Sequence, residues 1–288
     1  MNNRKPEWIR SKLKSIDDVV HTRKLLCKSH LATVCDEAMC PNKGECFSRG
    51  TATFIIMGKI CTRNCHFCNV TTGRPLPLDT TEPQILADTI KEMQLKYVVI
   101  TSVCRDDLLD DGAFHFSKCI KAIRDANKDI KIEILAPDFK KNIKNALEIL
   151  TNNLPDVFGH NIETVPRLYT KITPNRNYQF SLQLLKEHKK YFPQIPTKSG
   201  LMVGLGETDA EIIEVMTDLI TNGVSLLTIG QYLQPNKNCA SVDRYVTPEK
   251  FNEFTKIAKK IGFQGVASGP LVRSSYYADL LLLNGDLA

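Results

Sequence analysis

The sequence predicts an α/β protein whose main part is a partial (β/α)6 barrel of the TIM type, with an N-terminal cysteine-containing extension and a C-terminal closing segment. Two observations lead to this prediction. From Thr53 onward, short β-branched runs alternate with longer stretches of helical apolar spacing, which indicates repeated β/α units around a parallel sheet. The unusual polar residues and a cysteine-rich loop also follow the expected strands, where barrels of this kind carry their functional groups.

Six β/α units can be placed in order along the chain. The expected strands lie at residues 54–57, 97–101, 130–135, 157–161, 198–203 and 226–231, with an additional candidate at 265–267. The expected helices lie at residues 81–95, 114–126, 141–150, 178–190, 210–221 and 248–261. Six units suggest a partial barrel, because a complete one has eight. We therefore expect three parts: an extension at 1–50 that packs on the barrel mouth, the barrel at 51–268 and a closing segment at 269–288.

The bulk composition excludes several classes of protein. Hydrophobic residues make up 42% of the 288 positions and charged residues 24%, as in an ordinary globular domain. The net charge of +6 comes without a long basic run, so no nucleic-acid partner is indicated, although weak attraction to an acidic protein is compatible with it. No stretch of 18 apolar residues exists, and residues 1–14 lack the apolar core of a secretory signal. We expect a cytoplasmic protein without membrane contact.

The ten cysteines are more plausible as metal ligands or catalysts than as disulfide partners in a reducing compartment. Six of them form two triplets between Cys35 and Cys68. Each of the other four is expected to be an ordinary core or surface residue: Cys27, Cys104, Cys119 and Cys239. The triplets are therefore the candidate inorganic sites.

The downstream triplet, Cys61-Thr-Arg-Asn-Cys65-His-Phe-Cys68, has the spacing C-x3-C-x2-C. Three thiolates in one short loop can converge on a single inorganic centre. Structural zinc usually takes four protein ligands, and His66 lies between two ligating positions, from which it would turn to the same metal with difficulty. A cubane iron–sulfur cluster also normally takes four ligands, so three cysteines would leave one iron open to a small molecule. The triplet favours a cluster, with zinc as the alternative.

With Phe67 before its last cysteine, and placed after the first strand, this loop resembles the signature of the radical S-adenosylmethionine (SAM) superfamily. The resemblance implies that Cys61, Cys65 and Cys68 hold a catalytic 4Fe–4S cluster whose open iron chelates the amino and carboxylate groups of SAM. An electron from the cluster would cleave the sulfonium to methionine and a 5′-deoxyadenosyl radical, which abstracts a hydrogen from an unactivated carbon. The protein would position the cofactor and exclude water.

The upstream triplet, Cys35, Cys40 and Cys46, has the spacing C-x4-C-x5-C and offers a second three-thiolate site. Taken alone, it could also be a zinc knuckle or a structural bracket. Ahead of the downstream triplet, it resembles the arrangement in lipoyl synthases, which implies an auxiliary 4Fe–4S cluster consumed as the sulfur donor. Residues 273–276 match the family's Arg-Ser-Ser-Tyr segment, which implies that Ser275 ligates the fourth iron. A serine oxygen is held more weakly by iron than a thiolate and can leave when the cluster is dismantled.

The resemblance to lipoyl synthases covers nearly the whole chain, in the order that the family has. Matching blocks begin at Glu37, Thr51, Thr101, Arg105, His160, Gly230 and Ala267. The departures from the family pattern avoid the cluster ligands and fall at Phe47, Lys59, Gly159 and Tyr277. They leave the family assignment intact, although they can alter local packing or substrate affinity.

Contacts to SAM are expected beyond the ends of the fourth and fifth strands. Asn161 and Glu163 are well placed to hydrogen-bond the ribose or the methionine groups. Gly204 and Gly206 would let the backbone approach the adenine, and Arg167 could pair with the cofactor carboxylate. Plainer interpretations exist, because Gly-x-Gly-Glu is also an ordinary strand-to-helix turn and an arginine in a loop is often a solvated charge.

The family resemblance implies a sulfurtransferase that inserts sulfur at C6 and C8 of the octanoyl group on N6-octanoyl-lysine of lipoyl carrier domains. The carriers implied are acyltransferase subunits of 2-oxoacid dehydrogenases and the glycine cleavage H protein, and the implied reductant is of the ferredoxin or flavodoxin type. Two alternatives stay open. One is another radical SAM enzyme that inserts sulfur or transfers a methylthio group to a different acceptor, and the other is a non-catalytic metal-binding protein.

Overall fold

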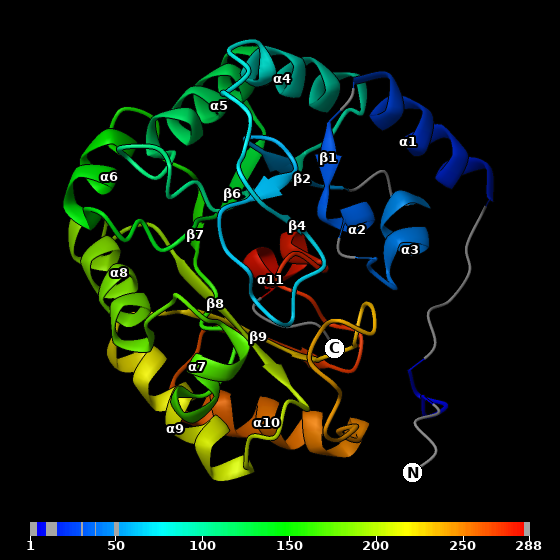
Figure 1. Ribbon diagram of the computed structural model, residues 1–288, viewed down its shortest axis with the longest axis vertical. Helices are drawn as coiled ribbons and strands as arrows, with labels where there is room; N and C mark the ends of the chain where they lie inside the picture. Colours follow the sequence, from blue (N-terminus) through cyan, green and yellow to red (C-terminus); the bar gives the residue numbers. More distant parts are fainter. Residues whose placement is uncertain (1–4, 10–15, 30, 38, 49–51, 285–288) are drawn as a thin grey trace.

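An eight-stranded sheet forms the centre of the protein, which a computed structural model describes at residues 5–9, 16–29, 31–37, 39–48 and 52–284 (Figure 1). All neighbouring strands are parallel except the first pair, which is antiparallel. The last strand has a single sheet neighbour within the described residues, so the barrel is open. In spatial order the strands are β1 (Ala32–Thr33), β2 (Thr53–Ile56), β5 (Tyr97–Ser102), β6 (Lys131–Leu135), β7 (Val157–Gly159), β8 (Thr197–Val203), β9 (Leu226–Gln231) and β10 (Gly265–Gly269).

Helices between successive parallel strands cover the outside of this sheet in an arc (Figure 1). The partial barrel predicted from the sequence is confirmed, and the additional candidate at 265–267 is β10, a seventh parallel strand. The covering helices are α4 (Glu82–Glu92), α5 (Ala113–Ala126), α6 (Ile143–Leu150), α8 (Tyr178–Tyr191), α9 (Asp209–Thr221) and α10 (Pro248–Ile261).

Side-chain caps decide where several of these helices begin. The Asn142 side chain accepts a hydrogen bond from the backbone N–H of Asn145 at 3.1 Å, so α6 begins at Ile143 rather than at 141 as predicted. Thr208 and Glu211 form a reciprocal capping box, so α9 begins one residue before the predicted 210. The six predicted helices of the barrel are therefore all present in the predicted order, and their starts follow the local capping chemistry.

The remaining elements lie near the chain ends and in the loops that follow strands. The extension carries α1 (Ile16–Ser29), α2 (Val34–Glu37) and α3 (Lys43–Ser48). Among the described residues, no helix has the length and apolar composition that crossing a membrane requires. The other short elements are β3 (Ile60–Cys61), β4 (Thr71–Thr72), the 3-10 turn η1 (Pro166–Leu168), α7 (Tyr169–Ile172) and α11 (Ala278–Asn284).

Alternation along the strands separates an apolar outer layer from the barrel interior. On β5, Val98 and Ile100 are buried against the helices, whereas Val99 and Thr101 line the interior. The outer layer also buries Phe54 of β2, which packs in the same apolar cluster. Because this layer is well packed, the strands form a rigid support for whatever their inner faces carry.

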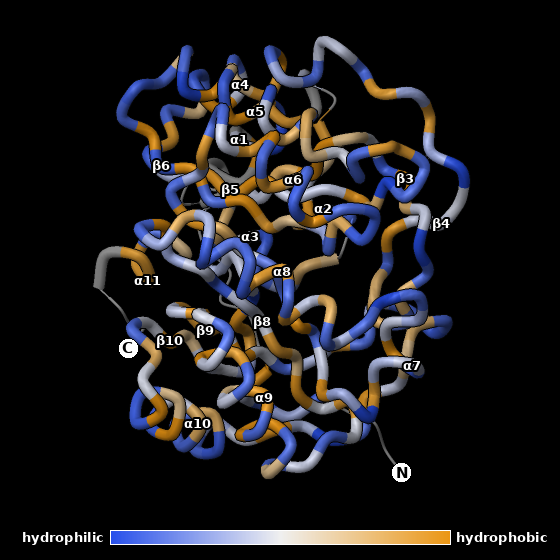
Figure 2. The backbone as a smooth tube through the Cα atoms, turned by 90° about the vertical axis from the view of Figure 1, so that its left-hand side faces the viewer, coloured by the Kyte–Doolittle hydropathy of each residue, from blue (hydrophilic) through white to orange (hydrophobic). Residues whose placement is uncertain are grey.

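A buried ion pair and α11 pack the amino-terminal end of the barrel. The Lys198 ammonium donates to both carboxylate oxygens of Glu133, at 2.8 and 3.0 Å, and the Tyr97 hydroxyl donates to the same carboxylate at 2.5 Å. Leu281 of α11 packs with Val157 at the start of β7. Figure 2 shows α11 on the opposite side of the molecule from β3, β4 and α7. The loops at the carboxyl ends of the strands are thus left to build the site.

The extension and the closing segment meet across the open side of the barrel. The Asn42 side-chain amide donates to the Leu271 carbonyl at 2.6 Å, and Glu45 accepts hydrogen bonds from the hydroxyls of Tyr276 and Tyr277, both at 2.8 Å. Beyond β10 the chain packs directly on β9, because a side chain at Gly230 would come within 2.1 Å of a backbone carbonyl oxygen. Residues that are far apart in the sequence therefore share this side of the barrel.

One buried histidine on the outer layer bears on stability. His188 of α8 stacks on Phe158 of β7 with ring centroids 3.9 Å apart, and both of its ring nitrogens lack a hydrogen-bond partner among the described residues. Burial, with a smaller contribution from Lys189, lowers the pKa of His188 to about 3. The imidazole is therefore neutral in the folded protein throughout the range where an exposed histidine titrates.

We predict that His188→Leu reduces the loss of stability at acidic pH. Between pH 7.5 and 5.5 the unfolded chain binds a proton at His188 and the folded chain does not, so the wild type loses about 1.4 kcal/mol that the variant keeps. Urea unfolding at both pH values, under anaerobic conditions, measures this difference. The contributions of all other titrating groups to the change in stability cancel in this comparison, because both proteins contain the same groups. Equal losses in the two proteins would contradict the prediction.

Candidate active site

A cavity of about 1040 Å³ occupies the interior of the barrel. Its walls come from the inner faces of the strands, from the loops that follow them, and from the segments before β2 and after β10. The structure brings both cysteine triplets to this one cavity, although one triplet lies outside the barrel sequence. The predicted site residues that line it are Cys35, Cys40, Cys46, Cys61, Cys65, Cys68, Asn161, Glu163 and Ser275.

The downstream triplet begins at Cys61, the last residue of β3, and continues in the loop between β3 and β4. The Cys61 sulfur accepts hydrogen bonds from the backbone N–H groups of Arg63 and Cys104, both at 3.4 Å, and the Cys68 sulfur accepts one from Val70 at 3.5 Å. Bonds of this kind orient thiolates and stabilise their negative charge. The loop is thus shaped to present sulfur atoms to the cavity.

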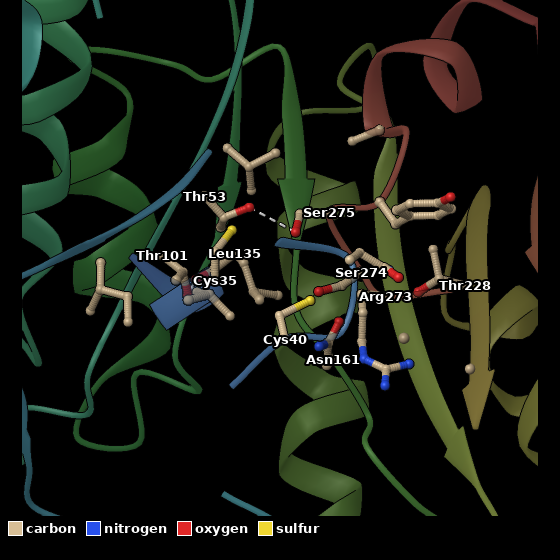
Figure 3. A pocket seen from close by; sticks show the side chains of 18 of the residues that line it. Cys35, Cys40, Thr53, Thr101, Leu135, Asn161, Thr228, Arg273, Ser274 and Ser275 are labelled. Atoms are coloured by element: carbon tan, nitrogen blue, oxygen red, sulfur yellow. Dashed lines mark hydrogen bonds between the residues drawn. The ribbon is translucent and has the colours of Figure 1, made fainter. Parts of the chain in front are cut away.

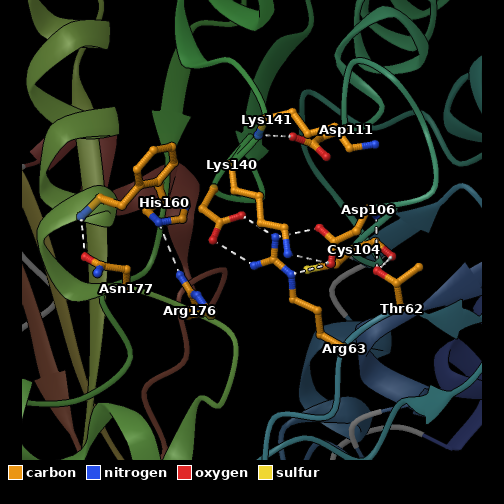
Figure 4. Close-up of polar contacts among 12 residues, drawn as sticks. Thr62, Arg63, Cys104, Asp106, Asp111, Lys140, Lys141, His160, Arg176 and Asn177 are labelled. Carbon is orange, nitrogen blue, oxygen red and sulfur yellow. Dashed lines mark hydrogen bonds and ion pairs between the residues drawn. The ribbon is translucent and has the colours of Figure 1, made fainter.

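Two carboxylates hold the same loop against the barrel through Arg63 (Figure 4). The buried guanidinium makes bidentate hydrogen bonds with Asp106, at 2.8 and 2.7 Å, and with Asp138, at 2.7 Å for both. Burial opposes ionisation of Asp138, but Arg63 outweighs it and lowers the pKa of that carboxyl. Because Asp106 follows β5 and Asp138 follows β6, the ion-pair network of these three residues fixes the cysteine loop to the rigid sheet.

The upstream triplet is organised by short helices and by contacts with the C-terminal segment. Cys35 lies in α2, and the Cys40 backbone N–H donates to its carbonyl at 3.2 Å. Cys46 lies in α3, and its N–H donates to the Asn42 carbonyl at 2.9 Å. Asn42 in turn binds the chain after β10, so the triplet is placed by residues from the other end of the sequence.

Ser275 reaches the upstream triplet from the C-terminal segment. Its hydroxyl accepts a hydrogen bond from the Thr53 hydroxyl at 2.8 Å, and Figure 3 shows this pair beside the Cys35 and Cys40 sulfurs. Thr53 begins β2, so the serine is positioned by the second strand of the sheet. The predicted serine ligand and two of the predicted thiol ligands thus converge in space.

Burial dominates the electrostatics of the thiols. Burial and the other cysteines raise the pKa of Cys35 to about 12, and burial, opposed by the Arg176 charge, raises that of Cys65 to about 12. Burial also raises the pKa of Cys68 to about 11. Cys61 differs, because a hydrogen bond with the Cys104 thiol lowers its pKa to about 6. Ionising these thiols together requires a nearby positive charge.

The donor set fits two iron–sulfur clusters. Soft thiolates are the usual ligands of such clusters, and iron ions supply the positive charge that holds buried thiols ionised. Within the described residues, no group of three or more His, Cys, Asp or Glu side chains is arranged to hold a single metal ion. The thiols of both triplets instead border one large cavity, which has room for inorganic clusters and for a small molecule beside them.

Asn161 and Glu163 follow β7 and face the cavity together with a third residue, Arg176, which sequence reasoning missed. The Arg176 guanidinium lies 3.7 Å from the Glu163 carboxylate and donates to the Asn161 carbonyl at 2.9 Å. It also contacts His160, whose pKa burial lowers to about 4 (Figure 4). Burial raises the pKa of Glu163. The sequence signal for Arg176 was weak, because it is one basic residue in an irregular segment.

The structure does not bring the other three predicted SAM contacts to the cavity. Arg167 is exposed, and its guanidinium forms a bidentate pair with Glu211 of α9, at 2.8 and 2.9 Å. Gly204 and Gly206 have φ values of +98° and +107°, and the turn that they form is occupied by the Glu207 carboxylate, which accepts from the Gly204 N–H at 2.6 Å. These glycines serve the strand-to-helix turn, which is the plainer of the two interpretations.

The scattered cysteines fall into different environments. Cys119 is a fully buried core residue of α5, as expected. Cys104, expected to be ordinary, instead lies in the cavity wall beside Cys61. Cys239 donates from its thiol to the Cys68 carbonyl at 3.4 Å. The Cys27 side chain lies outside the part of the chain that the structure describes.

Comparison with known proteins agrees with this geometry. The sequence profile of the Radical SAM superfamily matches residues 55–219. A lipoyl synthase of Haemophilus influenzae is 58% identical over 283 residues, which are 98% of this chain and 88% of the relative. A lipoyl synthase of Coxiella burnetii is 58% identical over 277 residues, 96% of this chain and 88% of the relative.

Solved structures share the fold at much lower identity. A methylornithine synthase superposes with a TM-score of 0.59 at 14% identity, over 88% of this chain and 72% of that one. Coproporphyrinogen III oxidase from Escherichia coli, a radical SAM enzyme, superposes with a TM-score of 0.55 at 13% identity, over 79% and 56%. Likeness at these identities establishes the common fold.

We predict that Asp138→Asn destabilises the protein by about 3–5 kcal/mol, because it leaves the buried Arg63 charge incompletely paired. Urea unfolding measures the change, and iron analysis after anaerobic purification should show a lower iron content per chain. The control is Asp125→Asn, which breaks an ion pair with Lys121 whose two side chains are 65% and 62% exposed. That exposed pair contributes about 0–1 kcal/mol. Similar effects of the two substitutions would disprove the role of the buried network.

Proposed function

Because the chain belongs to the lipoyl synthase family within the Radical SAM superfamily, we propose that it inserts sulfur at C6 and C8 of an octanoyl group held on a lysine of lipoyl carrier domains. The family resemblance inferred from the motifs is thereby confirmed. The observation that carries the proposal is that both cysteine triplets and Ser275 line one cavity. A carbon radical is short-lived, so the site that generates it and the site that supplies sulfur have to share one space.

Each part of the chain has a role in this proposal. Cys61, Cys65 and Cys68, in the barrel at 51–268, hold the cluster that binds SAM. The extension at 1–50 supplies the three thiolates of the auxiliary cluster, and the segment at 269–288 supplies its serine ligand, Ser275. When bound, the clusters and SAM supply reductive cleavage of the sulfonium and sulfide for the new C–S bonds.

The inner faces of the strands suit an unbranched acyl chain. Ile55, Val99, Leu135 and Met202 line the cavity, one from each of β2, β5, β6 and β8. Apolar walls of this kind bind a hydrocarbon by burying its surface, and they keep water away from a reactive carbon centre. The carriers in this proposal are acyltransferase subunits of 2-oxoacid dehydrogenases and the glycine cleavage H protein, and electrons come from a ferredoxin or flavodoxin-type protein.

For the cofactor contacts, we propose Arg176 together with Asn161 and Glu163. Arg176 lies in the cavity wall near Cys65 and, in the part of the chain that the structure describes, forms an ion pair with one carboxylate, Glu163, at 3.7 Å. Its forked guanidinium can therefore bind a further carboxylate, such as that of the methionine part of SAM. The Glu163 and Asn161 side chains lie beside it and can accept or donate hydrogen bonds to the amino group and the ribose.

We predict that the two triplets separate two activities. Cys61→Ala, Cys65→Ala or Cys68→Ala should abolish SAM cleavage, because the cofactor then has no iron to bind. Cys35→Ala, Cys40→Ala or Cys46→Ala should spare cleavage and block sulfur insertion, because the sulfur source is lost. The assay is anaerobic, with dithionite and an octanoyl-lysine peptide, and it measures 5′-deoxyadenosine and the mass of the peptide.

Iron and sulfide analysis measures how many clusters each variant retains, which is needed to interpret this assay. The wild type should contain about eight of each per chain, as two cubanes require. Variants of either triplet should retain about half. If variants of the upstream triplet still form the lipoyl peptide, its role as sulfur donor is excluded.

We predict that Arg176→Gln raises the KM for SAM about tenfold or more, because a hydrogen bond to a charged group contributes about 1.5–3 kcal/mol. Arg167→Gln should leave that KM unchanged within about twofold, since its guanidinium is already paired with Glu211. Steady-state formation of 5′-deoxyadenosine measures both values, and circular dichroism checks that both variants fold. If Arg167→Gln raises the KM for SAM and Arg176→Gln does not, Arg167 is the cofactor contact and the proposal for Arg176 is wrong.

A further inference from the structure

The cysteine loop separates two cavities. Besides the inner cavity, an outer pocket of about 340 Å³ lies on its other side, lined by His66 and by Asn236 and Asn238 of the loop after β9. Cys65 and Cys68 line both spaces. A group held by these thiols is therefore separated from the outer pocket by little more than the loop itself. Electron transfer slows steeply with distance, so this pocket offers a short route to the cluster.

Neighbouring segments hold the outer side of the loop in place. The His66 backbone N–H donates to the Ile172 carbonyl at 2.9 Å, its ring Nδ1 lies 2.7 Å from the Lys171 carbonyl, and the Ala240 N–H donates to the His66 carbonyl at 2.7 Å. The Asn236 side-chain amide donates to Asn69 at 2.5 Å. Three segments thus meet around the pocket, at residues 59–76, 169–178 and 231–242, and Glu37 of the extension adjoins them through the Asn69 side chain, which donates to the Glu37 carbonyl at 2.8 Å.

These three segments carry only positive charge. They contain no aspartate or glutamate, whereas the chain as a whole has 38 basic and 32 acidic residues. Arg74, Lys171 and Lys237 are exposed in them. Lys59 is also exposed and lies 4.0 Å from Glu37 of the extension. The exposed basic residues Arg74, Lys171 and Lys237 can attract an acidic protein and orient it during encounter.

We propose that this outer face, made by the three segments, is the docking site of a small acidic one-electron carrier protein. The inference rests on the proposed function, which needs one electron for each SAM cleaved. In the balanced step, the reduced carrier loses one electron to the cluster on Cys61, Cys65 and Cys68. That electron breaks the S–C5′ bond of SAM and yields methionine and the 5′-deoxyadenosyl radical. Carrier and substrate then use different faces of the loop, so they can be bound together.

The test uses the full chain with its clusters and an acidic flavodoxin, kept reduced by its NADPH-dependent reductase. The variant is Lys171→Glu with Lys237→Glu. We expect its Kd for flavodoxin, measured by interferometry in 50 mM salt, to rise at least tenfold, and flavodoxin-driven SAM cleavage at limiting carrier to fall similarly. Dithionite-driven cleavage should stay within twofold of wild type. In 500 mM salt the difference in Kd should shrink, because salt screens exposed charges.

A matched control carries the same charge change elsewhere. Lys186→Glu with Lys190→Glu alters two exposed residues near the end of α8 that leads into β8, at the opposite end of the barrel. This control should bind flavodoxin like wild type. If both variants lose affinity equally, net charge and not this face attracts the carrier, and the proposal fails.

Other outcomes separate the docking site from the proposed function. If the Lys171 and Lys237 variant binds flavodoxin normally but loses dithionite-driven sulfur insertion into an octanoylated carrier domain, the face docks the substrate protein and the docking proposal is wrong. If wild type cleaves no SAM even with dithionite, the proposed function is wrong. The Kd for flavodoxin still tests whether the outer face binds the carrier protein.

Discussion

An open parallel sheet leaves a gap between its two edges, and the site of this protein depends on how that gap is filled. The extension adds β1 to one edge, and beyond β10 the chain turns back onto β9 and runs toward the extension. Asn42 and Glu45 bind that returning segment through Leu271, Tyr276 and Tyr277. These polar contacts lie at the open side of the barrel, where a complete barrel would have further strands. The upstream cysteines and Ser275 consequently enter the same cavity as the cysteine loop.

Buried charge is the second constraint on the site. A buried charge in a cavity wall needs a partner of opposite charge, and two arginines, Arg63 and Arg176, lie in this wall. Arg63 is fully matched by Asp106 and Asp138, so its charge serves to position the loop. Among the described residues, the ion pair of Arg176 is with Glu163 alone, so its charge remains available to a ligand. The same type of side chain thus acts as a structural bridge in one place and as a binding group in the other, according to how many carboxylates surround it.

The cysteine loop separates the inner cavity from the outer pocket. Its inner side meets the apolar faces of the strands, which exclude water from a reactive carbon. Its outer side meets asparagines and exposed basic residues, which are polar and open to solvent. In the proposed function, this division explains how electrons enter from the outer side while the inner cavity excludes water. It also explains why the loop is anchored on both sides, to Asp106 and Asp138 inside and to Ile172 and Ala240 outside.

The sequence alone determined the alternation of strands and helices, and with it the partial barrel, because apolar periodicity is a local property of each segment. It also determined the cysteine triplets and the Arg-Ser-Ser-Tyr segment, because their spacings are short and unusual. Only the tertiary structure decided which loop residues face the cavity. Arg176 and Cys104 reach it and Arg167 does not, since Glu211 of a later helix pairs with Arg167. Such pairings join residues distant in sequence, and no local pattern encodes them.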